Sequence, residues 1–188
     1  MVFYLVRHAE SAPRADLQEA DWPLSENGAG QARDLARLLG RLGIGEVYSS
    51  PYRRAVDTVA PFAAAAGLDV RLMPGLRERK LVPGYLADFR GTAERAWLDF
   101  HFALPGCESS ADGQACMLRA VEDVRAGSRA AVVLLSSHGN AIGLLLNALT
   151  GGRFGYEDWL AMPRPALYRL EHSSGVLRFD ASFRADSI

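Results

Sequence analysis

The sequence predicts an α/β fold in which helices cover a mostly parallel sheet. Segments with strand character and segments with helical periodicity alternate along the chain with few interruptions. Residues 130–135 form the most hydrophobic run, and a continuous apolar run is typical of a parallel strand buried on both faces. With 188 residues the chain is long enough for one compact domain and short for two, so we expect residues 1–188 to form a single domain.

The composition is ordinary for a globular protein, with 49% apolar and 23% charged residues. A net charge of −1 gives no overall attraction to nucleic acid or to an anionic membrane, so an anionic ligand would need a local cluster of arginines. Cys107 and Cys116 show neither a disulfide framework nor a metal-binding spacing. Because the sequence shows no basic leader and no apolar run of bilayer length, we expect a cytoplasmic protein without nucleic-acid or membrane partners.

The first strand, residues 2–6, ends abruptly at Arg7 and His8. In open α/β sheets ligands bind at the carboxyl ends of the strands, where loops and helix N-termini converge. A guanidinium binds phosphate or carboxylate with a planar fork of donors, and an imidazole can attack an electrophile. The pair therefore suggests an anion-binding nucleophile. The alternative is that Arg7 covers the edge of the core and His8 lies in a turn.

Two helices follow in the next part of the chain. Residues 12–22 lack a clear period and predict a loop over the site, after which Ser25 is a natural N-cap for a helix ended by Gly43 and Gly45. A short strand at 46–49 then leads into a second helix that runs to Gly67.

Arg54 lies one turn into that second helix, where the free backbone N–H groups and the helix dipole favour an anion. Arg53 competes with Arg54 for this role, and both arginines could equally be solvated surface charges.

Glu78 lies on a loop after a predicted strand at 70–73, which Pro74 and Gly75 terminate. A carboxyl group in a water-poor pocket beside a bound phosphate could stay protonated and act as a general acid. The alternative is a surface salt bridge with Arg77, Arg79 or Lys80. The aromatic and amphipathic stretch 84–102 predicts one or two helices, and we expect residues 79–110 to form a lid or insertion over the site.

The central strand at 130–135 ends at His138, so that a second histidine is delivered to a carboxyl strand end. Gly139 lets the backbone turn closely, and the apolar run 141–149 predicts a buried helix whose N-terminus points at the same crevice. A helix is also expected from about residue 112 to 124. Residues 166–171 and 176–179 predict a terminal hairpin with His172 exposed in its turn, and residues beyond Phe183 are expected to fray.

The run Leu-Val-Arg-His-Ala-Glu-Ser at residues 5–11 resembles the signature of the histidine phosphatase superfamily, which has the phosphoglycerate-mutase-like fold. Further pieces that resemble the family follow in the family's order: residues 24–28 with Gln31 and Ala32, residues 49–51 with Arg54, Ala55 and Thr58, residues 76–78, and residues 137–139. Several pieces in order are far more specific than any one of them. The resemblance implies a three-layer α/β/α sandwich around a mostly parallel sheet.

The resemblance also implies a metal-independent mechanism without a cofactor. His8 would attack the phosphorus of a phosphate ester and form a phosphohistidine. Arg7, Arg54 and His138 would surround the phosphoryl oxygens, while Glu78 would protonate the leaving oxygen and then activate water. The expected partner is a small-molecule phosphate ester. We expect its contacts to come from residues beside the catalytic ones: Ser11, Arg14, Ser25, Gly139 and Asn140.

Departures from the family pattern concern the substrate. Ala9 stands in place of the usual glycine, Arg14 stands where mutase-like members often place an asparagine, and residues 106–109 are an imperfect version of a Gly-Glu-Ser motif. The segment between Glu78 and Gly106 is also shorter than the basic insertion of mutases. These differences favour a phosphatase.

Alternatives remain at the level of the sequence. They are a cofactor-dependent phosphoglycerate mutase, a phosphohistidine-protein phosphatase and a phosphate-binding module without catalysis. A metal site of His8, Glu78 and His138 is disfavoured, because Arg7 and Arg54 would repel the cation. The sequence does not reveal the oligomeric state, and a homodimer stays open.

Overall fold

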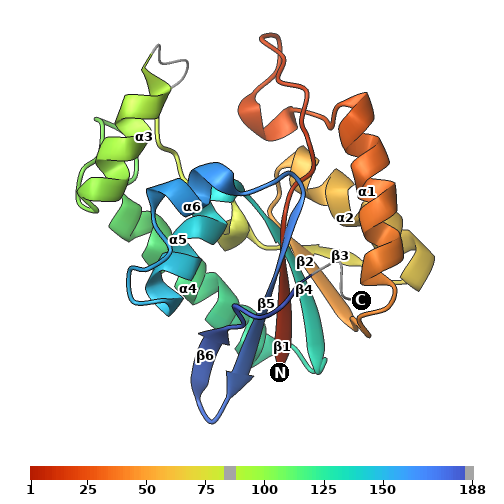
Figure 1. The fold of residues 1–188 in the computed structure, drawn as a ribbon. Helices are drawn as coiled ribbons and strands as arrows, with labels where there is room; N and C mark the ends of the chain where they lie inside the picture. Colours follow the sequence, from red (N-terminus) through yellow and green to blue (C-terminus); the bar gives the residue numbers. More distant parts are fainter. Residues whose placement is uncertain (83–87, 185–188) are drawn as a thin grey trace.

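The computed structural model describes residues 1–82 and 88–184, and a six-stranded sheet forms its centre (Figure 1). The strands are β1 (Val2–Arg7), β2 (Glu46–Ser49), β3 (Val70–Leu72), β4 (Val132–Ser137), β5 (Ala166–Ser173) and β6 (Val176–Phe179). The α-helices are α1 (Glu26–Leu39), α2 (Arg53–Ala66), α3 (Phe89–Leu98), α4 (Ser110–Gly127), α5 (Gly139–Leu149) and α6 (Tyr156–Ala161). Two short 3-10 helices are η1 (Glu19–Asp21) and η2 (Pro74–Leu76).

The strand order is β3-β2-β4-β1-β5-β6. The first four strands in this order run parallel, whereas β5 is antiparallel to β1 and β6 is antiparallel to β5. The predicted, mostly parallel sheet is thereby confirmed. In the register, Ser137 of β4 pairs with Arg7 of β1 and Ser136 pairs with Ser49 of β2, so three carboxyl strand ends lie side by side.

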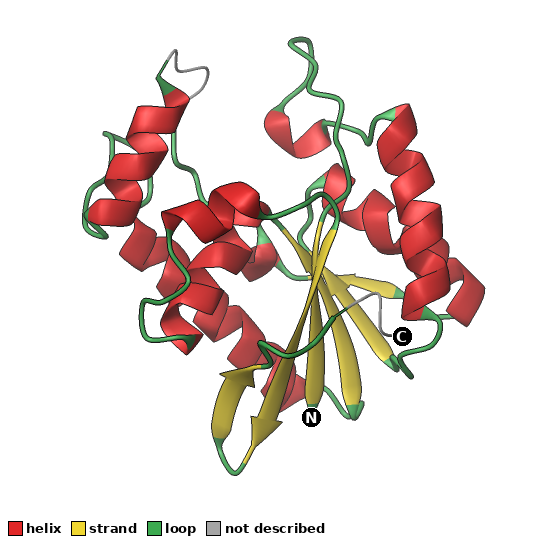
Figure 2. Cartoon of the chain, in the orientation of Figure 1, coloured by secondary structure: helices red, strands yellow, loops and turns green. Residues whose placement is uncertain are grey.

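Helices cover both faces of the sheet (Figure 2). On β1, Tyr4 and Val6 pack in one cluster with residues of α1 and α2, while Phe3 and Leu5 pack in another with residues of α4 and α5. Alternate side chains of a strand point to opposite faces, and an apolar residue at every position therefore builds two cores. The structure confirms the three-layer α/β/α sandwich.

Several element boundaries differ from the predicted ones. Helix α1 begins after its Ser25 cap as predicted but ends at Leu39, because Gly40 follows directly and the chain turns before Gly43, which has a φ of +66°. Helix α2 ends as predicted, at Gly67 in the left-handed region with a φ of +67°. Helix α4 begins at Ser110, slightly earlier than predicted, because Ser109 and Asp112 form a capping box.

The prediction for His172 was wrong. This residue lies within β5, is half-buried and pairs with Leu177 of β6, and the hairpin turn comes after Ser173. The backbone N–H of His172 donates to the carbonyl of Met1, which extends β5 alongside the start of the chain.

The segment 79–110 contains α3, which rises beside the carboxyl ends of the strands (Figure 1). Its residues Ala93 and Ala96 pack with Leu81 in a small cluster that Trp159 of α6 joins. Part of the predicted helical stretch, including Tyr85, lies outside the described residues, as does the predicted frayed end apart from Arg184. The lid role of this segment stays a prediction. Within residues 1–82 and 88–184, no helix combines the length and apolar character needed to cross a membrane.

Candidate active site

The ends of β1 and β4 and the first turn of α2 bring two histidines and an arginine together. The ring centroids of His8 and His138 lie 5.2 Å apart. Nε of Arg54 donates to Nε2 of His8 over 3.2 Å. Residues from three distant parts of the sequence therefore share one small volume at the carboxyl edge of the sheet, where α/β proteins bind ligands.

The protonation state of His8 follows from its two hydrogen-bond partners. The Ala9 carbonyl, 2.7 Å from Nδ1, can only accept, and Nε of Arg54, which faces Nε2, can only donate. The ring is thus neutral, with its proton on Nδ1 and its lone pair on Nε2. Burial, followed by the charges of Arg54 and Arg7, lowers the pKa of His8 to about 3. His8 is only 7% exposed, and a neutral imidazole of this kind can act as a nitrogen nucleophile.

Arg7 lies beside His8 with its guanidinium buried. Its Nη1 donates to the carbonyl of Met162, while its Nε is a buried donor without a partner among the described residues. Burial lowers its pKa to about 10, which still leaves the group charged at neutral pH. Gly139 makes room for it, because a Cβ at residue 139 would lie 2.9 Å from Cζ of Arg7. A buried cation with an unused donor is suited to an anionic ligand.

All three nitrogens of the Arg54 guanidinium donate hydrogen bonds. Besides the contact with His8, its Nη1 donates to the carbonyl of Glu19 over 2.7 Å and its Nη2 donates to Oε1 of Glu19 over 2.9 Å. The ring of Tyr52 lies 4.9 Å from its Cζ. Arg53, the competing candidate, instead pairs with Asp57 on the exposed side of α2. The structure therefore places Arg54, and not Arg53, beside His8.

His138 precedes α5 and is completely buried. Its Nε2 lies 2.8 Å from Oγ of Ser50, and its Nδ1 has no partner among the described residues. Burial, with the nearby charge of Arg54, lowers the pKa of His138 well below its usual value. The second histidine is thus also uncharged at neutral pH.

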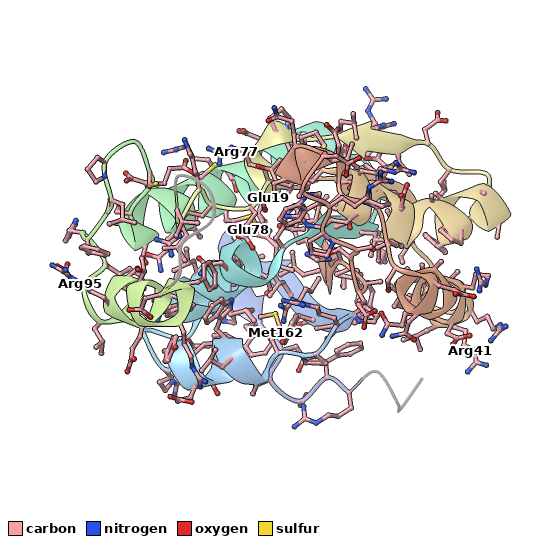
Figure 3. The ribbon with its side chains drawn as sticks, turned by 90° about the horizontal axis from the view of Figure 1, so that it is seen from above. Glu19, Arg41, Arg77, Glu78, Arg95 and Met162 are labelled. Atoms are coloured by element: carbon pink, nitrogen blue, oxygen red, sulfur yellow. The ribbon has the colours of Figure 1, made fainter. Side chains whose placement is uncertain are left out.

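Glu78 occupies the N-terminus of α5. Its Oε2 accepts from the backbone N–H of Asn140, and its Oε1 accepts from those of Ala141 and Arg79, over 3.0 to 3.1 Å. Burial raises the pKa of this carboxyl, while the three N–H donors act in the opposite direction. In Figure 3, Glu78 and Glu19 both lie over the middle of the molecule, seen from above the strand ends.

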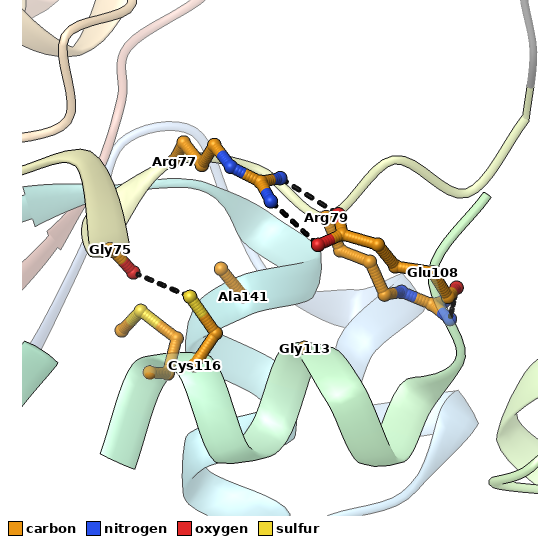
Figure 4. A pocket seen from close by; sticks show the side chains of 8 residues that line it. Gly75, Arg77, Arg79, Glu108, Gly113, Cys116 and Ala141 are labelled. Carbon is orange, nitrogen blue, oxygen red and sulfur yellow. Dashed lines mark hydrogen bonds and ion pairs between the residues drawn. The ribbon is translucent and has the colours of Figure 1, made fainter. Parts of the chain in front are cut away.

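The two arginines that flank Glu78 in the sequence direct their guanidinium groups to Glu108 and not to the Glu78 carboxylate. Arg77 forms a two-bond ion pair with Glu108, with donor–acceptor distances of 2.6 and 2.7 Å (Figure 4). The buried Arg79 donates to the side chain of Asn140 and to the carbonyl of Glu108. A salt bridge from Glu78 to its charged neighbours, the alternative interpretation, is absent from the described part of the chain. These contacts leave Glu78 among backbone donors at the site.

The five predicted substrate-binding residues have different surroundings. Ser25 accepts from the N–H of Gly28 and donates to the carboxylate of Glu10, so its hydroxyl caps α1. Arg14 is exposed and pairs with Asp16. The roles of both residues toward a substrate stay predictions.

Of the other three, Gly139 and Asn140 come shortly after the end of β4. Ser11 forms an isolated antiparallel bridge with Leu24, which joins the two ends of the loop at residues 12–23. Gly139 lies against Arg7, and the side chain of Asn140 accepts from Arg79 while its Nδ2 is buried without a partner among the described residues. Substrate contacts of Ser11, Gly139 and Asn140 also stay predictions.

Sequence reasoning missed three residues at the site: Glu19, Ser50 and Tyr52. Ser50 and Tyr52 follow β2 directly, so the strand-end argument that selected His8 and His138 could have found them. Glu19 could not be found in this way, because it lies in a segment without periodicity, whose path over the strand ends the sequence does not predict. No group of three His, Cys, Asp or Glu side chains is arranged to hold a metal ion among the residues that the structure describes.

A mostly parallel sheet covered on both faces, with a neutral histidine and two arginines at its strand ends, is typical of phosphoglycerate-mutase-like proteins. Comparison with known families agrees with this class. The chain belongs to the histidine phosphatase superfamily (branch 1), whose model matches residues 3–183. The resemblance that the sequence motifs indicated is thereby confirmed.

Individual relatives are named as mutases or as phosphatases. The chain is 30% identical over 180 residues to "Probable phosphoglycerate mutase GpmB" of Serratia proteamaculans, covering 90% of this chain and 84% of the relative. The solved structure of a mycobacterial glucosyl-3-phosphoglycerate phosphatase with inorganic phosphate is 27% identical, with a TM-score of 0.77 over 96% of this chain and 95% of that one. YhfR of Bacillus stearothermophilus, 23% identical with a TM-score of 0.79 over 95% and 94% of the two chains, shares the fold.

Proposed function

We propose that this protein is a metal-independent phosphomonoesterase that acts through a phosphohistidine on His8. The observation that carries this proposal is the state of His8: Nδ1 is tied to a carbonyl, and the lone pair of Nε2 lies at the strand ends beside Arg54. A nitrogen nucleophile next to fixed cations is suited to attack on a phosphoryl group.

In the first step, the phosphoryl oxygens bind to Arg7 and Arg54. Nε of Arg54 then donates its hydrogen bond to a phosphoryl oxygen instead of to His8, which frees the lone pair of His8 Nε2. Nε2 of His8 then attacks the phosphorus, an N–P bond forms and the P–O bond to the leaving group breaks. Protonated Glu78 supplies the proton to the leaving oxygen. His138, which is neutral and 5.2 Å from His8, adds a polar contact without adding charge.

In the second step, the Glu78 carboxylate removes a proton from water, whose oxygen attacks the phosphohistidine. The N–P bond breaks, Nε2 regains its lone pair and inorganic phosphate leaves. The environment of Glu78 serves both steps, because burial favours its protonated form and the N–H donors of α5 stabilise its charged form.

The alternative, a phosphoglycerate mutase, has the support of the relatives' names. One ion pair favours hydrolysis. Arg77 donates to both carboxylate oxygens of Glu108, so this cation beside Glu78 is already used within the protein. A mutase has to hold the carboxylate of phosphoglycerate while the phosphoryl group is on the enzyme, which would require a free cation.

The experiment is hydrolysis of p-nitrophenyl phosphate in excess EDTA by wild type, His8→Ala and His101→Ala. His101 is an exposed histidine in the turn after α3, and it is not among the described residues that contact His8, Arg54 or His138, so it is the matched control. We expect activity in wild type and His101→Ala and none in His8→Ala. Conversion of 3-phosphoglycerate to its isomer, faster than phosphate release, would instead establish the mutase.

A further inference from the structure

Glu19 is a carboxylate in direct contact with a proposed catalytic arginine. It begins η1, in the segment between β1 and α1 that rises over the strand ends (Figure 1). Arg54 is 5% exposed and Glu19 is 53% exposed, and Oε1 of Glu19 lies 2.9 Å from Nη2 of Arg54. The pair therefore has one buried partner and one partner that faces solvent at the entrance of the site.

The donors of Arg54 divide between two directions. Nε faces the nucleophilic nitrogen of His8, whereas both terminal nitrogens face Glu19, one through the backbone carbonyl and one through the carboxylate. A phosphoryl group at His8 approaches the Nε side of the guanidinium. Only the guanidinium of Arg54 then separates the bound ester from the carboxylate of Glu19.

We propose that Glu19 determines specificity by charge: it favours esters whose leaving group carries an ammonium and disfavours those whose leaving group carries a carboxylate. This inference rests on the proposed function and names its substrate class. The exposed half of Glu19 can pair with a cation of the substrate while the residue stays on Arg54. An anionic leaving group meets a fixed like charge instead.

The surrounding charges do not cancel this effect. Arg14, on the same loop as Glu19, pairs with Asp16, and Arg53, the neighbour of Arg54, pairs with Asp57. Arg164 follows Met162 and Pro163, whose carbonyls accept from Arg7, and its charge acts on both Arg7 and His8. Arg164 is unchanged when Glu19 is replaced, so a comparison of variants isolates the contribution of Glu19.

The test uses three esters of similar size: 2-aminoethyl phosphate, 2-phosphoglycolate and propyl phosphate. They are hydrolysed by wild type, Glu19→Gln and Asp21→Asn. Glutamine keeps the shape and the backbone bond of residue 19 and removes only the charge. Asp21 lies in the same short helix, and its replacement removes the same charge while the contact between Glu19 and Arg54 is kept, so it is the matched control.

We expect wild type to prefer the aminoethyl ester over phosphoglycolate. In Glu19→Gln the ratio of their kcat/KM values should fall about tenfold, which corresponds to about 1.4 kcal/mol. Most of the change should lie in KM, as expected for a residue that acts on leaving-group charge, and the rate with propyl phosphate is the reference to which the rates with both charged esters are normalised. Asp21→Asn should leave the ratio unchanged.

An equal ratio in wild type and Glu19→Gln, or a wild-type preference for phosphoglycolate, would overturn the inference. Failure of the proposed function is recognised separately, since wild type would then hydrolyse none of the three esters and no p-nitrophenyl phosphate. Calorimetric titration of wild type and Glu19→Gln with the same esters then decides the inference by binding alone. Glu19→Gln must weaken binding of 2-aminoethyl phosphate relative to binding of 2-phosphoglycolate.

Discussion

Replacement of Gly139 by alanine should disturb the site through Arg7. A Cβ at this position would lie 2.9 Å from both Cζ and Nε of Arg7 and 3.0 Å from Nη2. Non-bonded carbon atoms prefer separations of about 3.5–4.0 Å, so the guanidinium has to retreat by roughly 0.5–1 Å. Arg7 is buried and bonded to the carbonyl of Met162, and it can move only by weakening that bond.

A displacement of about 1 Å in a positioning group can cost on the order of 10²-fold in rate, and we expect kcat/KM for p-nitrophenyl phosphate to fall by about 10- to 100-fold. Overpacking of this kind costs about 1–3 kcal/mol in the free energy of unfolding. At about 2–4 °C per kcal/mol for a chain of this size, Tm should drop by roughly 2–12 °C.

Gly30→Ala is the control for this experiment. Gly30 also lies in a helix, and a Cβ there would meet only the end of an exposed arginine side chain at 3.9 Å. Its activity should be unchanged, and Tm should rise slightly, because alanine favours a helix over glycine by about 1 kcal/mol. Wild-type kcat/KM in Gly139→Ala would refute the link between this glycine and the position of Arg7.

Three other predictions concern the acid, the histidines and a helix cap. Glu78→Gln should slow hydrolysis of alkyl phosphates by about 10²- to 10⁴-fold and that of p-nitrophenyl phosphate far less, because only a poor leaving group needs the proton; equal losses with both would remove Glu78 from the acid role. The pKa of His8 is lowered to about 3, so between that pH and its unfolded value of about 6.5 the unfolded chain binds more protons. The free energy of unfolding should therefore fall from pH 7 to pH 5, and urea titrations should show a smaller fall in His8→Asn. Ser25→Ala should reduce the free energy of unfolding by about 1 kcal/mol through loss of the α1 cap. If Ser25 instead contacts substrate, KM will rise in this variant.

The sequence predicted the sheet and the positions of the two histidines because both depend on local patterns. Apolar runs mark β1 and β4 as strands, and the first polar residues after each run must lie at the carboxyl edge. The parallel pairing of β1 with β4, which the structure shows and the sequence did not predict, then places His8 beside His138. The end of α1 was missed, since apolar periodicity continued to Leu42 although the helix stops before Gly40.

Contacts between distant segments were beyond such patterns. From its local sequence, Glu78 could be either a solvated charge or a buried acid. The N–H donors that hold it in the site belong to Asn140 and Ala141, about sixty residues further along the chain. Glu108 illustrates the same limit, because its pairing with Arg77 depends on how the segment between them folds back. Glu19 reaches Arg54 through an aperiodic loop, which propensities do not position.

The central claim is that His8 carries the phosphoryl group during turnover. The most direct measurement is rapid quenching of wild type and His8→Ala with p-nitrophenyl phosphate, followed by digestion and mass spectrometry under alkaline conditions that preserve phosphohistidine. We predict one phosphoryl group on the peptide that contains His8 in wild type, and no phosphoryl group and no turnover in His8→Ala. Turnover by His8→Ala, or a phosphoryl group on another residue, would contradict the account.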